Sequence, residues 1–170
     1  MRKGYFKGVI TDTAALIIGA IYAFLCILTR ILSDSPYEAL HRLNGCGAIP
    51  PMWILNLLSV LWCFLAGFAW GIVWREIRIC RVRGAEEIRA YQGGLFFISL
   101  IFLSLIWYPL FFICERIFIS MLVALGAAIC ATLASVLWKR VSFLPSLICA
   151  AYSFWLFYVF AVNLAVLLKN

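Results

Sequence analysis

The stretch from Val141 to Leu168, VSFLPSLICAAYSFWLFYVFAVNLAVLL, contains no Asp, Glu, Lys or Arg. It exceeds the roughly 20 apolar residues that an α-helix needs to cross the hydrocarbon core of a bilayer. Four other stretches are equally free of charge: residues 13–29, 43–74, 90–114 and 117–138. All of them are too long and too uniformly apolar for transmembrane β-strands, which need about 9–11 residues of alternating polarity. The sequence therefore predicts an all-α integral membrane protein with five transmembrane helices.

The composition of the chain excludes the main classes of soluble protein. Hydrophobic residues make up 66% of the 170 residues and charged residues only 12%, against roughly 45–50% and about 25% in a soluble domain. A soluble enzyme, a secreted disulfide module and a disordered tail are all excluded. We predict one membrane domain over residues 1–170. The predicted transmembrane spans are residues 9–32, 51–74, 91–113, 117–138 and 143–168. The loop between the first two spans, residues 33–49, is predicted to form a lid.

The distribution of basic residues predicts the orientation in the membrane. Five spans place the N-terminus and the connections between spans two and three and between spans four and five on one face. That face carries ten of the Lys and Arg residues, against four on the other face. Because short loops rich in Lys and Arg stay in the cytoplasm, we predict the N-terminus inside and the C-terminus outside. The net charge of +7 then follows from topology, and no nucleic acid partner is needed to explain it.

The sequence lacks the patterns of metal or hydrolytic chemistry. It has a single histidine, His41, and its seven cysteines form no C-x-x-C pair, so free thiols are expected rather than a metal site. Phosphate-binding loops and Ser-His-Asp arrangements are missing as well. We therefore predict no catalytic residue, no metal site and no cofactor.

Aromatic and weakly polar residues repeat at helical spacing in three of the predicted spans. In the last span, Tyr152, Trp155, Val159 and Asn163 share one face. Such a face suits a flat, mostly apolar ligand, but it also suits packing between helices in lipid, and both interpretations stay open. The corresponding residues in the second and third spans are Asn56, Ser59, Cys63 and Gly67, and Phe97, Leu100, Ser104, Trp107 and Phe111.

Short motifs follow one another in a fixed order along the chain. They are PPMWIL at residues 50–55, WYPLFF at 107–112 and AYSFW at 151–155, followed by Asn163. Together they resemble the motifs P-P-G-W-V-F, W-S-P-L-F-F and P-Y-L-A-W of the translocator protein family (TspO/MBR, also called tryptophan-rich sensory proteins or peripheral benzodiazepine receptors). Members of that family are about this long and have five transmembrane helices.

This resemblance implies a ligand pocket inside the helix bundle, beneath the loop 33–49. Family members bind porphyrins and synthetic isoquinoline or benzodiazepine-like compounds, and they are commonly dimeric. By position, Trp155 would form an aromatic wall and Val159 the floor, extended by Tyr152 and Asn163. The other candidate ligand-binding residues are Pro51, Trp53, Leu100, Ser104 and Trp107. We expect a homodimer in a bacterial cell membrane that contacts lipid and binds porphyrin or haem as a ligand, not as a cofactor.

The chain departs from the family pattern at several positions. Ala48 replaces a tryptophan ahead of the double proline, and Leu100 and Ser104 replace a polar Gln and Asn pair. Leu164 replaces the tyrosine of the cholesterol-recognition pattern. Loss of the two amides removes hydrogen-bond partners, so polar drug ligands should bind more weakly.

Three functions are compatible with the resemblance. The first is a receptor, sensor or transporter that binds a porphyrin-like ligand. The second is an enzyme for light-dependent porphyrin degradation, which would rely on the tryptophan that Ala48 replaces. The third is a membrane partner or sterol-handling subunit whose apolar faces only pack against other molecules.

Overall fold

The computed structural model describes residues 13–31, 52–78 and 84–169, and all predictions for Pro51 and for the loop 33–49 lie outside these residues. The described residues form five helices, each long and apolar enough to cross a membrane. In chain order they are α2 (Thr13–Ile31), α4 (Met52–Arg78), α5 (Ala85–Phe112), α6 (Ile117–Trp138) and α7 (Phe143–Lys169). The predicted all-α, five-helix membrane fold is confirmed.

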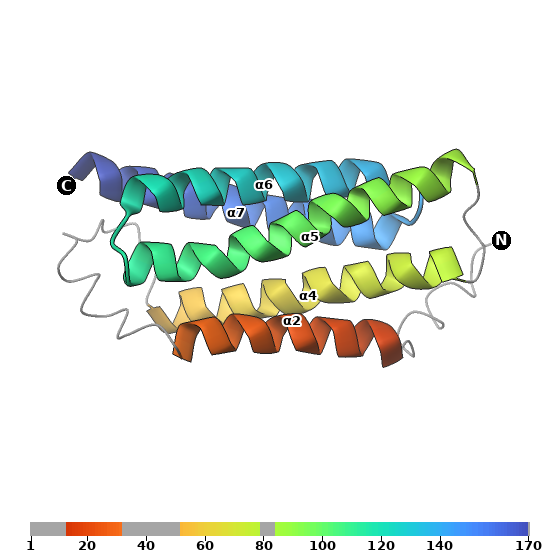
Figure 1. Cartoon of the computed structure of the whole chain (residues 1–170), viewed down its shortest axis with the longest axis horizontal. Coiled ribbons are helices and arrows are strands. Elements are labelled where there is room, and N and C mark those ends of the chain that lie inside the picture. Colours follow the sequence, from red (N-terminus) through yellow and green to blue (C-terminus); the bar gives the residue numbers. More distant parts are fainter. Residues whose placement is uncertain (1–12, 32–51, 79–83, 170) are drawn as a thin grey trace.

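The five helices run up and down and form two groups (Figure 1). Helix α2 packs most extensively on α4, whereas α6 packs on both α5 and α7. Smaller contacts of α4 with α7, and of α5 with α2 and α4, join the two groups. Helix α4 ends, and α5 begins, at the same end of the bundle where α6 ends and α7 begins. This arrangement fits the predicted topology, while the side of the membrane that this end faces stays a prediction.

Two helices extend beyond the spans predicted from the absence of charge. Helix α4 continues past residue 74 to Arg78, and α5 begins at Ala85 rather than at residue 91. Basic residues lie in the last turn of α4 and acidic residues in the first turn of α5, where each sign of charge is favoured by the helix dipole. Charged residues end the hydrocarbon-spanning part of a helix but do not end the helix itself.

Helices α2 and α4 approach so closely that their backbones touch. A Cβ atom added to Gly71 would lie 2.3 Å from the Cα of Ala15, and one added to Gly67 would lie 2.8 Å from the Cα of Gly19. Such small residues allow close helix packing in lipid, where van der Waals contact replaces the hydrophobic driving force. The small-residue motif of α4 therefore joins two helices of the same chain, and the expected homodimer stays a prediction.

Buried and partly buried aromatic rings join the two groups near the end of α4. Trp70 of α4 stacks on Phe97 of α5 and on Trp138 of α6, with ring centroids 5.7 and 5.8 Å apart. The indole Nε1 of Trp138 donates a hydrogen bond to the carbonyl oxygen of Ala90, 3.3 Å away. Because the indole N–H is satisfied, this large side chain can be fully buried. The cluster fixes one end of the bundle.

Serine and threonine side chains join α6 to α7. The hydroxyl of Ser135 donates to the carbonyl oxygen of Ser146 at 2.8 Å, and the hydroxyl of Ser146 donates back to the carbonyl oxygen of Ser135 at 2.9 Å. Further along, the hydroxyls of Thr132 and Ser153 lie 2.7 Å apart. Such bonds hold helices together in lipid, where no water competes for the polar groups. Hydrogen bonds as well as packing therefore hold α6 and α7 together.

Candidate ligand-binding cavity

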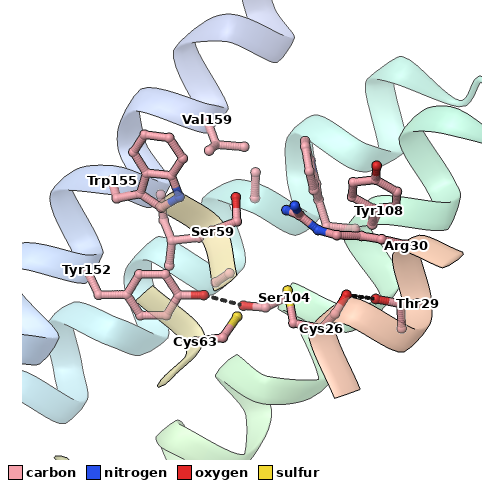
Figure 2. A pocket seen from close by; sticks show the side chains of 14 residues that line it. Cys26, Thr29, Arg30, Ser59, Cys63, Ser104, Tyr108, Tyr152, Trp155 and Val159 are labelled. Carbon is pink, nitrogen blue, oxygen red and sulfur yellow. Dashed lines mark hydrogen bonds between the residues drawn. The ribbon is translucent and has the colours of Figure 1, made fainter. Parts of the chain in front are cut away.

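A cavity of about 40 Å³ lies between the two groups of helices, and all five helices contribute to its wall (Figure 2). We call it the main cavity. Its lining is mostly apolar, with a few hydroxyl and thiol groups and one guanidinium. The residues that line it are Cys26, Thr29, Arg30, Ser59, Cys63, Ser104, Trp107, Tyr108, Ala124, Ala127, Tyr152, Trp155, Leu156 and Val159.

Helix α7 supplies an aromatic wall of the main cavity. Tyr152, Trp155 and Val159 follow one another at steps of three and four residues, so they share one helix face. That face is turned toward α2, α4 and α5 (Figure 2). The ring of Tyr152 stacks on Trp62, with centroids 5.9 Å apart and planes inclined by 15°. The hydroxyls of Tyr152 and Ser104 are hydrogen-bonded at 3.2 Å, so the polar end of this ring is already oriented.

Arg30 supplies the positive charge of the main cavity. It lies near the C-terminal end of α2, and its Nη1 donates a hydrogen bond to the Oδ1 of Asn56 at 2.7 Å. Its guanidinium carbon lies 4.9 Å from the centroid of the Tyr108 ring, within the range of a cation–π contact. Figure 2 shows the side chain reaching across the cavity toward Ser59 and the aromatic wall. The cavity therefore has an aromatic side and a cationic side.

A second cavity of about 20 Å³ lies next to the main one, because Trp107 and Val159 line both. Its other lining residues include Phe111, Phe112 and Asn163. Both polar atoms of the Asn163 amide and the indole Nε1 of Trp107 are buried and have no hydrogen-bond partner among the described residues. Two buried hydrogen-bonding groups therefore flank a small, mostly apolar space.

Because the buried amide of Asn163 has no hydrogen-bond partner among the described residues, replacing it with an apolar side chain should stabilise the protein. A buried polar group without a partner costs about 1–3 kcal/mol. Asn163→Leu should therefore raise the midpoint of thermal unfolding in detergent. Asn56→Leu is the matched control, because the amide oxygen of Asn56 accepts a hydrogen bond from Arg30. This substitution should lower the midpoint of thermal unfolding. Thermal scans of both variants test this pair, and a midpoint lowered equally by both would contradict the description of Asn163.

The structure gathers most of the candidate residues predicted from the sequence. Tyr152, Trp155, Val159, Ser104 and Trp107 line the main cavity, and Asn163 lines the second cavity. Leu100 is fully buried in the core of the bundle and lines neither cavity. Trp53 is 68% exposed and also lines neither, because its side chain lies on the outer surface of α4. Pro51 lies outside the described residues.

Sequence reasoning did not include several cavity residues among its candidates. Arg30 lies within the predicted span 9–32 and counts in the sequence only as a basic residue of one membrane face, because it directly follows the first charge-free stretch. Ser59 and Cys63 belong to a polar helix face that the spacing did reveal, although nothing in the sequence indicated that this face points to α7. Cys26 and Thr29 carried no signal beyond their small size. Long-range packing decides which helix faces meet.

The chemistry of the main cavity favours binding. Within the described residues its lining contains no carboxylate and no imidazole; its ionisable groups are thiols, phenols and one guanidinium. The same part of the chain holds no cluster of three His, Cys, Asp or Glu residues. Aromatic rings, isolated hydroxyls and one cation can orient a ligand by stacking, hydrogen bonding and charge.

Comparison with known protein families gives a match. The TspO/MBR family model matches residues 13–168, which include all five helices and the lining of both cavities. No curated protein sequence matches the chain. Members of this family are generally membrane receptors, sensors or transporters rather than enzymes. The match covers nearly the entire chain, and the chain is therefore a multi-pass integral membrane protein of the TspO/MBR family.

Proposed function

We propose that this protein is a membrane receptor, sensor or transporter that binds porphyrin, or a similarly flat apolar molecule, inside its helix bundle. The observation that carries the proposal is the main cavity, which all five helices line and whose aromatic wall is formed by Tyr152 and Trp155. Rings of this kind stack on a planar ligand, and isolated polar groups orient it. The bacterial cell membrane is the location we propose.

The size of the main cavity indicates that the bundle opens when it binds a ligand. A volume of about 40 Å³ is enough for a few water molecules, whereas sites for drug-sized ligands span about 300–1,000 Å³. The cavity lies where the α2–α4 pair meets α5, α6 and α7, and the contacts between these groups are the smaller ones in the bundle. We infer that the two groups move apart at this junction, because the contacts within each group are more extensive than the contacts between the groups.

Ala48 and the lining of the main cavity favour porphyrin binding over porphyrin degradation. The tryptophan on which family members would rely for light-dependent breakdown is replaced by Ala48. The cavity lining offers aromatic rings for stacking and one guanidinium for charge pairing, and its described residues include no carboxylate and no imidazole. The proposal is therefore a binding role, in which the porphyrin leaves the protein chemically unchanged.

Titration of the purified protein with protoporphyrin IX, followed by porphyrin absorbance and tryptophan fluorescence, tests this function. We expect saturable binding. Trp155→Leu should raise the dissociation constant roughly tenfold, because a stacked aromatic pair contributes about 0.5–1.5 kcal/mol beyond burial of its area. Trp53→Leu is the matched control, since Trp53 is exposed on the outer surface of α4, and it should bind as the unaltered protein does. Absence of saturable binding, or equal weakening by both substitutions, would refute the proposal.

A further inference from the structure

Arg30 is the one charged residue in the lining of the main cavity, as far as the described residues extend. A guanidinium remains protonated in proteins, so this side of the cavity is permanently cationic. Its partners among the described residues are the amide of Asn56 at 2.7 Å, the ring of Tyr108 at 4.9 Å and the thiol of Cys26, and none of them is a carboxylate. Arg30 is half-buried, and taking a charge partly out of water is costly unless it is paired. A ligand with a negative group would provide that pairing.

The nitrogen atoms of the Arg30 guanidinium differ in their hydrogen bonding. Nη1 donates to Asn56, whereas the Nε of Arg30 is buried without a hydrogen-bond partner among the described residues. The Nε and Nη2 groups of an arginine present two parallel N–H bonds, a geometry that matches the two oxygens of a carboxylate. The contact with Asn56 also fixes the side chain in place, so little additional ordering is required on binding.

The opposite side of the main cavity is aromatic. Figure 2 shows Arg30 on one side and Tyr152 and Trp155 on the other, with Ser59 between them. A ligand that satisfies both sides at once has a flat apolar body and an acidic group at its edge. A neutral sterol or a neutral drug would leave the charge of Arg30 uncompensated.

We propose that Arg30 is the anion-recognition residue of the main cavity, and that its ligand is an amphipathic acid, a flat aromatic molecule with a carboxylate at its edge. This inference rests on the proposed function and narrows the class of ligand. The phosphate of a membrane lipid could supply the same negative charge from outside the bundle. The position of Arg30 in the cavity lining, facing the aromatic wall, favours the carboxylate of a bound ligand.

The test compares protoporphyrin IX, which carries two carboxylates, with its dimethyl ester, which carries none and keeps the same ring. Both are titrated into the protein in a non-ionic detergent free of phospholipid. The unaltered protein should bind the diacid at least about tenfold more tightly than the ester, as expected for a charged hydrogen bond. Arg30→Gln should weaken binding of the diacid to the level of the ester and leave the ester unchanged. Arg30→Lys should retain part of the preference.

Arg116→Gln is the matched control, because Arg116 is exposed between α5 and α6 and lines neither cavity. It should leave the preference for the diacid intact. Absence of a preference in the unaltered protein, or equal weakening of both ligands by Arg30→Gln, would overturn the role of Arg30 while the cavity assignment stands. A role in binding lipid phosphate would instead appear as Arg30-dependent thermal stabilisation by phosphatidylglycerol with an unchanged preference, and it would overturn the inference too. Failure of both porphyrins to bind would refute the proposed function itself.

Discussion

Substituting alanine for Gly71 is expected to separate α2 from α4 and to cause a large loss of stability. The added Cβ would lie 2.3 Å from the Cα and 2.7 Å from the Cβ of Ala15. The nearest atoms include backbone, so no side-chain rotation relieves the clash, and one helix must move. Overpacking of this kind costs about 1–3 kcal/mol and occasionally more, and we expect the upper end of that range. Thermal unfolding in detergent, followed by circular dichroism, measures it.

Gly126→Ala is the matched control for this substitution. It introduces the same methyl group within helix α6, where the new Cβ would lie 3.5 Å from a side-chain methyl carbon of Leu103, an ordinary van der Waals distance. Because alanine favours a helix over glycine by about 1 kcal/mol, this variant should be as stable as the unaltered protein or more so. Equal destabilisation by Gly71→Ala and Gly126→Ala would show that the α2–α4 contact is not as close as described.

Enlarging Val159 to phenylalanine is expected to abolish ligand binding. Val159 is buried and lines both cavities, so a larger side chain fills the space that a ligand ring must enter. The new ring occupies existing cavity volume, and the bundle should therefore remain folded. A porphyrin titration together with a thermal scan separates loss of binding from loss of structure.

Ala161→Phe provides the comparison for Val159→Phe. Ala161 is exposed on the outer surface of α7, two residues further along the same helix. It also becomes phenylalanine, but its side chain points away from both cavities. Binding should be unaffected. If Val159→Phe binds porphyrin as tightly as Ala161→Phe does, the ligand lies elsewhere.

The helices and most of the aromatic wall could be predicted from the sequence because local physics determines them. Stretches without charge identify the spans, and a helical repeat places Tyr152, Trp155 and Val159 on one face whatever surrounds them. The turns that extend α4 to Arg78 and begin α5 at Ala85 were missed. Charged residues are compatible with helix outside the hydrocarbon core, and a criterion based on charge cannot detect such turns.

The cationic side of the cavity could not be predicted in this way. Arg30 looks like a typical boundary charge in the sequence, and only the packing of α2 against α4 and α5 turns it toward Asn56 and Tyr108. Trp53 is the opposite case, a residue that the sequence predicts to bind ligand and that lies outside both cavities. Its place in a motif favoured a role in binding, yet its position on α4 leaves it exposed on the outer surface. Contacts between helices far apart in sequence decide both cases.

Photochemical labelling tests most directly whether the main cavity holds the ligand. A protoporphyrin derivative carrying a diazirine is bound, irradiated and mapped on the protein by mass spectrometry of its peptides. We predict adducts on the inward-facing residues Tyr152, Trp155 and Val159 of α7, suppressed by an excess of unlabelled protoporphyrin IX. Adducts confined to the exposed residues Phe154 and Phe157, or adducts that excess porphyrin does not suppress, would contradict a binding site inside the bundle.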